Sequence, residues 1–172
     1  MDIKGRVAEG LGGLEKLMKG IPGYRGYKEK EVRREADKLL RMHLARQFEE
    51  QRGRLSEVQV QLTDKGQLAA VATLERAMMK LQLLIDRLKT ASYGYAGWFD
   101  AVKVGEKELD TLYAFDNALA DGVAQVAKAI DGLAAAATKD EDPTAMANDL
   151  VATLEQINGT FSKRQDVILQ AS

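Results

Sequence analysis

Residues 106–137, EKELDTLYAFDNALADGVAQVAKAIDGLAAAA, carry the clearest structural signal in the chain. Apolar residues recur there at three- and four-residue spacing, at Leu109, Leu112, Leu119, Val123, Val126, Ile130 and Leu133. This spacing places them on one face of an α-helix and predicts a long amphipathic helix over the whole range. One position of the same face holds a charged residue, Asp116.

Three other segments show the same periodicity, at about residues 27–62, 65–92 and 143–170. Their apolar rows are Leu44, Phe48, Leu55, Val58 and Leu62; Val71, Leu74, Met78, Leu81, Ile85 and Leu88; and Ala147, Leu150, Leu154, Ile157, Phe161 and Ile168. Long helices with short connections predict an all-α chain, folded as an antiparallel up-down-up-down four-helix bundle. An open helical hairpin that dimerises is the main alternative.

The expected helix ends come from capping residues. We expect the first long helix to begin near Tyr27, and Thr63-Asp64 to cap the second helix. Asp142 and Pro143 have the residue types that favour a helix start before the last segment. Within the first helix, the row Val32, Ala36, Leu39 and His43 suggests that the buried face rotates by about 100° near its start.

Residues 1–26 are expected to form an N-terminal amphipathic arm and a Gly/Pro loop, separate from the bundle at residues 27–172. The arm has apolar residues at helical spacing, namely Ile3, Val7, Leu11, Leu14 and Met18. Four glycines within the segment weaken an isolated helix. We therefore expect the arm to be ordered by docking, either on its own bundle or on a partner chain or membrane surface.

Composition removes several classes of chemistry. The chain has no cysteine, which excludes disulfides, cysteine-ligated metal sites and thiol nucleophiles and fits a reducing cytoplasm. It has a single histidine, His43, and no Glu-x-x-His pair of the kind found in di-iron helical proteins. Phosphate-binding and dinucleotide-binding glycine motifs are also absent. No catalytic residue, metal site or cofactor is predicted.

Counting along antiparallel helices brings four polar residues to one approximate layer: His43, Gln82, Asp116 and Arg164. Because an unpaired buried charge is costly, Asp116 should have a partner, and Arg164 is the natural choice. The layer can fix the alignment of the helices, or it can form a small-ligand or proton-handling site between them.

The same counting predicts an aromatic pole at one end of the bundle, made of Tyr24, Tyr27, Tyr93, Tyr95, Trp98 and Phe99. This cluster can close the end of the core. Alternatively, it can form a binding surface, since tyrosine and tryptophan are enriched at binding hot spots.

Charge is distributed unevenly although the net charge is −1. A basic face is expected on the first long helix, at Lys30, Arg34, Lys38 and Arg41. Acidic residues three or four positions away, such as Asp37 beside Arg41, are spaced to pair with it. The overall pI of about 5.9 argues against a nucleic acid partner.

The leading hypothesis for function is a non-enzymatic module for protein–protein interaction or assembly, with self-association into a homo-oligomer. One alternative is peripheral binding to an anionic membrane surface, through the arm and the basic first helix. Another is a bundle that binds a small molecule. A cytoplasmic location, at a membrane surface under the first alternative, is expected.

Overall fold

The computed structural model describes residues 14–91 and 105–170. The elements in these ranges are a short 3-10 turn, η1 (Lys30–Val32), and four long helices, α2 (Arg33–Asp64), α3 (Leu68–Thr90), α5 (Glu106–Thr138) and α6 (Thr144–Gln170). Residues 14–20 are also helical, and no strand occurs in either range. The predicted all-α class is confirmed.

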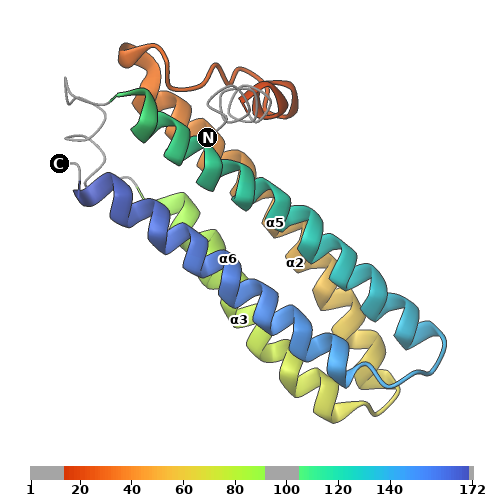
Figure 1. Cartoon of the computed structure of the whole chain (residues 1–172). Coiled ribbons are helices and arrows are strands. Elements are labelled where there is room, and N and C mark those ends of the chain that lie inside the picture. The colour runs from red at the N-terminus through yellow and green to blue at the C-terminus, as the bar shows by residue number, and fades with distance from the viewer. Residues whose placement is uncertain (1–13, 92–104, 171–172) are drawn as a thin grey trace, which may run out of the picture.

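The long helices lie side by side (Figure 1). α2 packs against α3 and α5, and α6 packs against the same two helices. Two connections, at residues 65–67 and 139–143, lie at the same end of the molecule. Lys65 joins them, because its ammonium group donates to Asp140 Oδ1 at 2.6 Å and to the carbonyl of Ala137.

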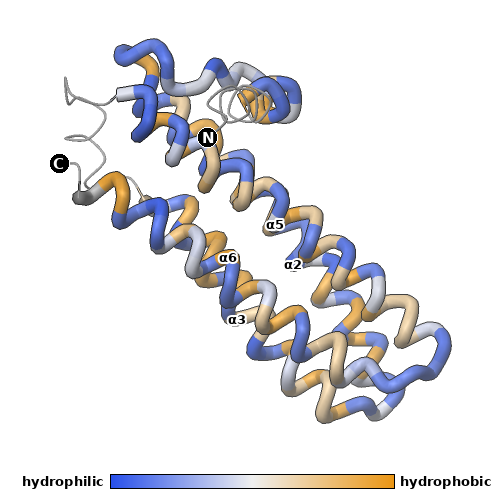
Figure 2. The backbone as a smooth tube through the Cα atoms, in the orientation of Figure 1, coloured by the Kyte–Doolittle hydropathy of each residue, from blue (hydrophilic) through white to orange (hydrophobic). Residues whose placement is uncertain are grey.

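The apolar rows explain why these helices pack. Hydrophobic and hydrophilic segments alternate along each long helix (Figure 2). All the apolar residues predicted to line one face of α6 are buried, from Ala147 to Ile168. The five predicted on α2 are buried as well, from Leu44 to Leu62. On α3, Val71 and Met78 are only partly buried and lie at the edge of the core.

Two predicted helix boundaries differ from the observed ones. α2 begins at Arg33, after the 3-10 turn, rather than near Tyr27. Thr63 and Asp64 do not cap α3, since they form the last turn of α2 and the chain reverses at Gly66, which has a φ of 73°. At the start of α6, the Asp142 carboxylate accepts the backbone N–H of Thr144 at 3.0 Å, as its predicted capping role requires.

The buried face of α2 does not rotate as expected. Ala36 is buried, but Val32, Leu39 and His43 are only partly buried. Instead, the row of Leu44 and Phe48 continues towards the helix start through Leu40 and the charged residues Asp37 and Arg41. The prediction was wrong because it left out the charged residues Asp37 and Arg41, which are buried.

The described part of the N-terminal arm packs on the long helices. Leu14, Leu17 and Ile21 are buried and belong to the same hydrophobic core as those helices. Met18, expected on the apolar row, is 46% exposed, and Leu17 takes the buried position instead. Ile3, Val7 and Leu11 lie outside the described residues.

None of the described helices combines the length and the apolar character needed to cross a membrane.

Candidate functional site: a buried ionic network

Asp116 and Arg164 meet in the core. Arg164 Nε donates to Asp116 Oδ1 at 2.7 Å, and both side chains are completely buried. Asp116 projects from α5 and Arg164 from α6, each at a position that interrupts the apolar row of its helix. This pair therefore joins two neighbouring helices inside the hydrophobic core.

A second ion pair extends the network onto α2. The Asp37 carboxylate accepts from Arg164 Nη2 through one oxygen and from Arg41 Nε, at 2.8 Å, through the other. Arg41 also donates to the carbonyl of Leu88 on α3 at 2.7 Å. Two carboxylates and two guanidinium groups thus face each other, so the formal charges of these four groups balance. The four long helices all contribute an atom to this network.

Tyr27 connects the loop before α2 to this network through hydrogen bonds. Its hydroxyl donates to Asp116 Oδ2 at 2.6 Å. Its backbone N–H donates to the Tyr113 hydroxyl at 2.6 Å, and its carbonyl accepts from Arg33 Nε at 2.6 Å. The ring of Tyr24 packs edge-on against that of Tyr27, with centroids 5.9 Å apart. These three hydrogen bonds hold the loop against α2 and α5.

Gly26 is needed for this close approach. Its φ is 78°, a conformation that side chains with a Cβ rarely adopt. A Cβ at this position would lie 2.6 Å from the Tyr113 hydroxyl and 2.7 Å from Leu14 Cδ1. Glycine at position 26 lets the backbone reach Tyr113, which then binds the next N–H.

Burial shifts the ionisation of these groups. Desolvation raises the pKa of Tyr27 and of Tyr24, and the nearby negative charge of Asp116 raises both further. Burial also raises the pKa of Tyr113, while its hydrogen bond with the Tyr27 backbone opposes the shift. Desolvation raises the pKa of Asp116, and Arg164 and Tyr27 act in the opposite direction. The tyrosines therefore stay protonated at neutral pH. The Tyr27 hydroxyl donates to Asp116, and the Tyr113 hydroxyl accepts from the Tyr27 backbone.

Two residues of the expected polar layer lie outside the network. Gln82 is only partly buried, and its amide donates to Asp86 on the same helix at 2.8 Å. His43 is partly buried and lines a surface groove. Each follows or precedes a buried leucine by one residue, so it points about 100° away from the core. Asp37 takes the place expected for His43, about 9 Å away along α2, and the carbonyl of Leu88 is the contribution of α3.

The other predicted surfaces are only partly described. Tyr24 and Tyr27 of the aromatic pole are buried. Tyr93, Tyr95, Trp98 and Phe99 lie outside the described residues. On the expected basic face, Lys30, Arg34 and Lys38 are exposed, whereas Arg41 is 3% exposed and belongs to the buried network. The basic face therefore consists of three residues instead of four, because Arg41 is buried together with Asp37.

Sequence reasoning paired Asp37 with Arg41, and the structure contains that ion pair, but it is buried in the core and not on the expected surface face. Arg33 and Tyr113 were missed. A usable signal existed for the burial of Asp37 and Arg41. Counting back seven residues from Leu44 gives position 37, and seven back from Phe48 gives position 41. Extending the heptad positions through charged residues would have placed both inside the core. For Arg33 and Tyr113, whose partners are in an irregular loop, periodicity gives no signal.

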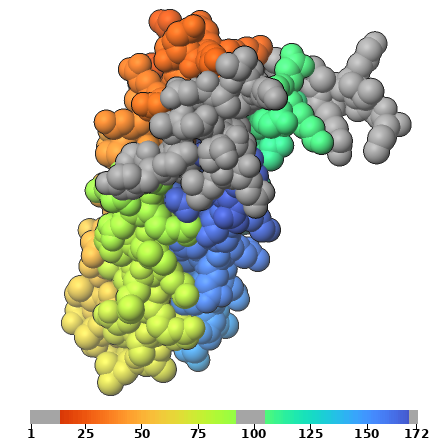
Figure 3. Space-filling model, turned by 90° about the vertical axis from the view of Figure 1, so that its left-hand side faces the viewer, coloured from red at the N-terminus to blue at the C-terminus, as the bar shows by residue number. Residues whose placement is uncertain are grey.

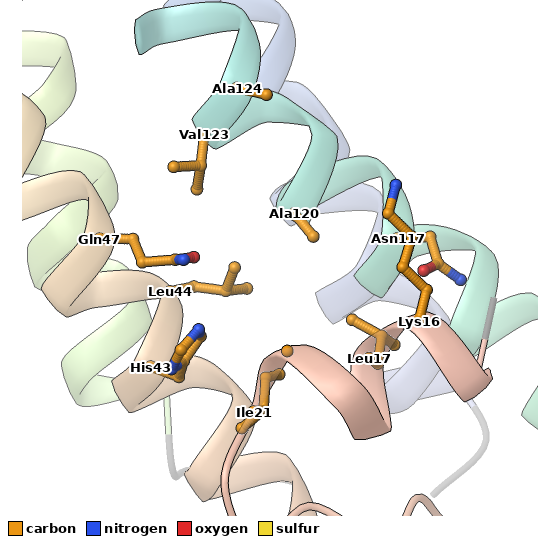
Figure 4. A pocket seen from close by; sticks show the side chains of 11 residues that line it. Lys16, Leu17, Ile21, His43, Leu44, Gln47, Asn117, Ala120, Val123 and Ala124 are labelled. Atoms are coloured by element: carbon orange, nitrogen blue, oxygen red, sulfur yellow. The ribbon is translucent and has the colours of Figure 1, made fainter.

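A groove lies beside the network, between residues 16–21, α2 and α5 (Figure 4). Its volume is about 300 Å³. Most of its lining is apolar, and His43, Gln47, Lys16 and Asn117 supply the polar groups. In the part of the chain that the structure describes, no group of three or more histidine, aspartate or glutamate side chains is placed to hold a metal ion.

No protein-family model, curated protein or solved structure matches this chain.

Proposed function

We propose that this chain is a non-enzymatic assembly module, an antiparallel up-down-up-down four-helix bundle that self-associates through the outer face of α3. The observation that carries the proposal is a row of exposed apolar side chains on that helix. The bundle topology is supported by the short connections at residues 65–67 and 139–143 and by the side-by-side packing of the helices.

The row consists of Leu68, Met79 and Leu83, whose residues are 67%, 71% and 52% exposed. At 100° per residue they fall within an arc of about 60° on the helix surface. They extend over about 22 Å along the axis. Among the described residues, the other large apolar side chains with comparable exposure, Met18, Val60 and Met146, lie on three different elements. Exposed apolar side chains that share one face of a helix favour a contact surface.

Polar contacts border the row on both sides. Towards α2, Gln59 donates to Glu75 at 2.7 Å, and Lys89 pairs with Glu49. Towards α6, Lys80 lies 3.1 Å from Glu155, and Arg87 donates to the carbonyl of Asn158 at 3.0 Å. α3 lies between these two helices on the face seen in Figure 3. The apolar row therefore lies on the side of α3 that faces neither α2 nor α6, where another chain can contact it. The polar residues on both sides would form the rim of that interface.

A non-catalytic role is supported by the buried network. Asp116 and Arg164 are completely buried, and their polar atoms bind each other, Tyr27 and Asp37. These are the groups that a proton-handling site would have used. Their mutual pairing favours a role in aligning the helices.

Binding to a membrane surface has less support. Leu14, one of the residues expected to enter the membrane, is 8% exposed and packs in the core. Among the described residues of the arm, Met18 is exposed, and the basic face keeps three exposed residues. A single exposed methionine does not make an apolar face that could enter a membrane. We therefore place the contact surface on α3.

The absence of cysteine gives a direct test. A Leu83→Cys variant has a single thiol on the proposed contact surface, and a short bismaleimide reagent should link two copies of it efficiently. Val60→Cys is the matched control, because Val60 is 59% exposed on α2. Equal linking of the two variants, or none for Leu83→Cys at high protein concentration, would contradict the proposal.

A further inference from the structure

The groove beside His43 has the size and lining of a small-molecule site. Its volume of about 300 Å³ lies at the lower end of the range for ligand pockets. Leu17 and Ile21 form one wall, Leu44 belongs to α2, and Ala120 and Val123 belong to α5. The small side chain at position 120 leaves space that a larger residue would fill.

Polar groups occur on opposite sides of this apolar surface (Figure 4). His43 and Gln47 are one turn apart on α2 and point into the groove. Burial lowers the pKa of His43, and the positive charge of Arg46 lowers it further, so its imidazole is neutral at pH 7. Gln47 and His43 can therefore both donate a hydrogen bond without adding charge.

Lys16 supplies the positive charge on the opposite side. Its ammonium lies 3.2 Å from Asp121 Oδ1, and the two side chains are 73% and 58% exposed. An ion pair as exposed as this contributes little stability. A ligand carboxylate can therefore take the place of Asp121 at small cost.

From this arrangement we propose that the groove binds an amphipathic monocarboxylate, with its hydrocarbon chain between α2 and α5 and its carboxylate at Lys16. The apolar lining favours an alkyl chain of about eight carbons, because that length fits the volume. The cationic group at the rim selects an anion over an amine of the same length. The site is separate from the outer face of α3.

Octanoate is a suitable probe, and His43 is a suitable reporter, because it is the single histidine in the chain. Titration of the full chain with octanoate should shift the His43 imidazole proton signals with saturation on the order of 1 mM, as expected for a ligand of this size. Octylamine, with the same chain and the opposite charge, should bind at least about fivefold more weakly.

Two variants and one control locate the site. Lys16→Gln should weaken octanoate binding about threefold to fivefold. Lys19→Gln, which removes a similarly exposed lysine paired with Glu15 at 3.0 Å, should leave it unchanged. Ala120→Leu should reduce binding at least about tenfold by occupying the groove, with helix content checked by circular dichroism.

The opposite results would overturn the inference. They are the absence of a saturable shift at His43 up to about 20 mM octanoate, equal binding of octylamine, or undiminished binding by a folded Ala120→Leu variant. Equal effects of Lys16→Gln and Lys19→Gln would also do so, since binding would then follow overall charge.

Discussion

Arg164 contacts both buried carboxylates, so the charge of each residue in the network is balanced only while its neighbours are present. Removing Arg164 leaves Asp37 and Asp116 facing one guanidinium group, that of Arg41. Removing the charge of Asp116 leaves two guanidinium groups facing Asp37. Either single change creates an unbalanced buried charge, whereas removing both restores the Asp37–Arg41 pair as a balanced unit.

A double-mutant cycle measures this dependence. Arg164→Met and Asp116→Asn should each lower the free energy of unfolding by about 3–5 kcal/mol. The double variant should be less destabilised than the sum of the two, by about 1–3 kcal/mol. Urea unfolding of the four proteins checks this prediction. Additive losses would mean that the two side chains do not act as a pair.

The buried tyrosines predict a loss of stability at alkaline pH. Burial raises the pKa of Tyr24, Tyr27 and Tyr113 above the value of about 10 in an unfolded chain. Above about pH 10 the unfolded chain loses these protons first, so the free energy of unfolding falls as pH rises. Their contribution is fully present below about pH 10.

Absorbance at 295 nm follows this ionisation. The native protein has five tyrosines, and the three described here should ionise only at a pH above that seen for the urea-unfolded chain. A Tyr27→Phe variant should lose about 1.5–3 kcal/mol at neutral pH, and this difference should shrink above about pH 10. Native and unfolded titration curves that coincide would show that these tyrosines are accessible.

At the level of the single residue, sequence reasoning found Asp116 and Arg164 because each interrupts a clear apolar row. It placed His43 and Gln82 beside them because counting along helices fixes height only to about one turn. The true partner on α2, Asp37, is six positions from His43, and the chain before Arg33 is not a regular helix. Hydrogen bonds to a loop have no period, so Tyr27 could not be placed by counting.

At the level of the element, Gly53 and Gly26 have different structural effects: one concerns helix propensity, and the other concerns backbone conformation and steric contact. Gly53 lies in the middle of α2 with no atom within 4 Å of an added Cβ. Gly26, by contrast, combines a φ of 78° with contacts of 2.6 Å and 2.7 Å to an added Cβ. One glycine only weakens its helix, and the other permits a loop to approach α5.

These two sites should respond in opposite directions to alanine. Gly53→Ala should raise the free energy of unfolding by about 0.5–1 kcal/mol, through helix propensity. Gly26→Ala should lower it by about 1–3 kcal/mol or more, through strain and steric contact. Thermal or urea unfolding of both variants checks the signs. A neutral Gly26→Ala would mean that the loop is not held as described.

The sequence predicted the presence of each long helix more accurately than the residues at which the helices begin and end. The rows of α5 and α6 were identified almost completely, because every apolar residue predicted on them is buried except Val123, which is partly buried. The start of α2 was misplaced by six residues, since Tyr27 belongs to the loop that binds Tyr113 and Asp116. Local sequence cannot reveal this, because the competing contacts come from a helix about 86 residues later.

At the level of the whole molecule, the buried and exposed features have different roles in our proposal. The ionic network aligns the helices, and the row of Leu68, Met79 and Leu83 provides the contact surface. Sequence alone could not identify that row, because apolar residues surround much of α3. Only the packing against α2 and α6 leaves some of them exposed.

Sedimentation velocity over about 1–500 μM protein, a range that spans typical weak and strong self-association, tests the proposed function most directly. The mass of the wild-type chain should rise from 18.9 kDa towards twice that value. The Met79→Glu/Leu83→Glu variant should remain at 18.9 kDa with unchanged helix content, while Val60→Glu should behave as the wild type. A wild-type chain that stays at 18.9 kDa over the whole range would contradict self-association through α3.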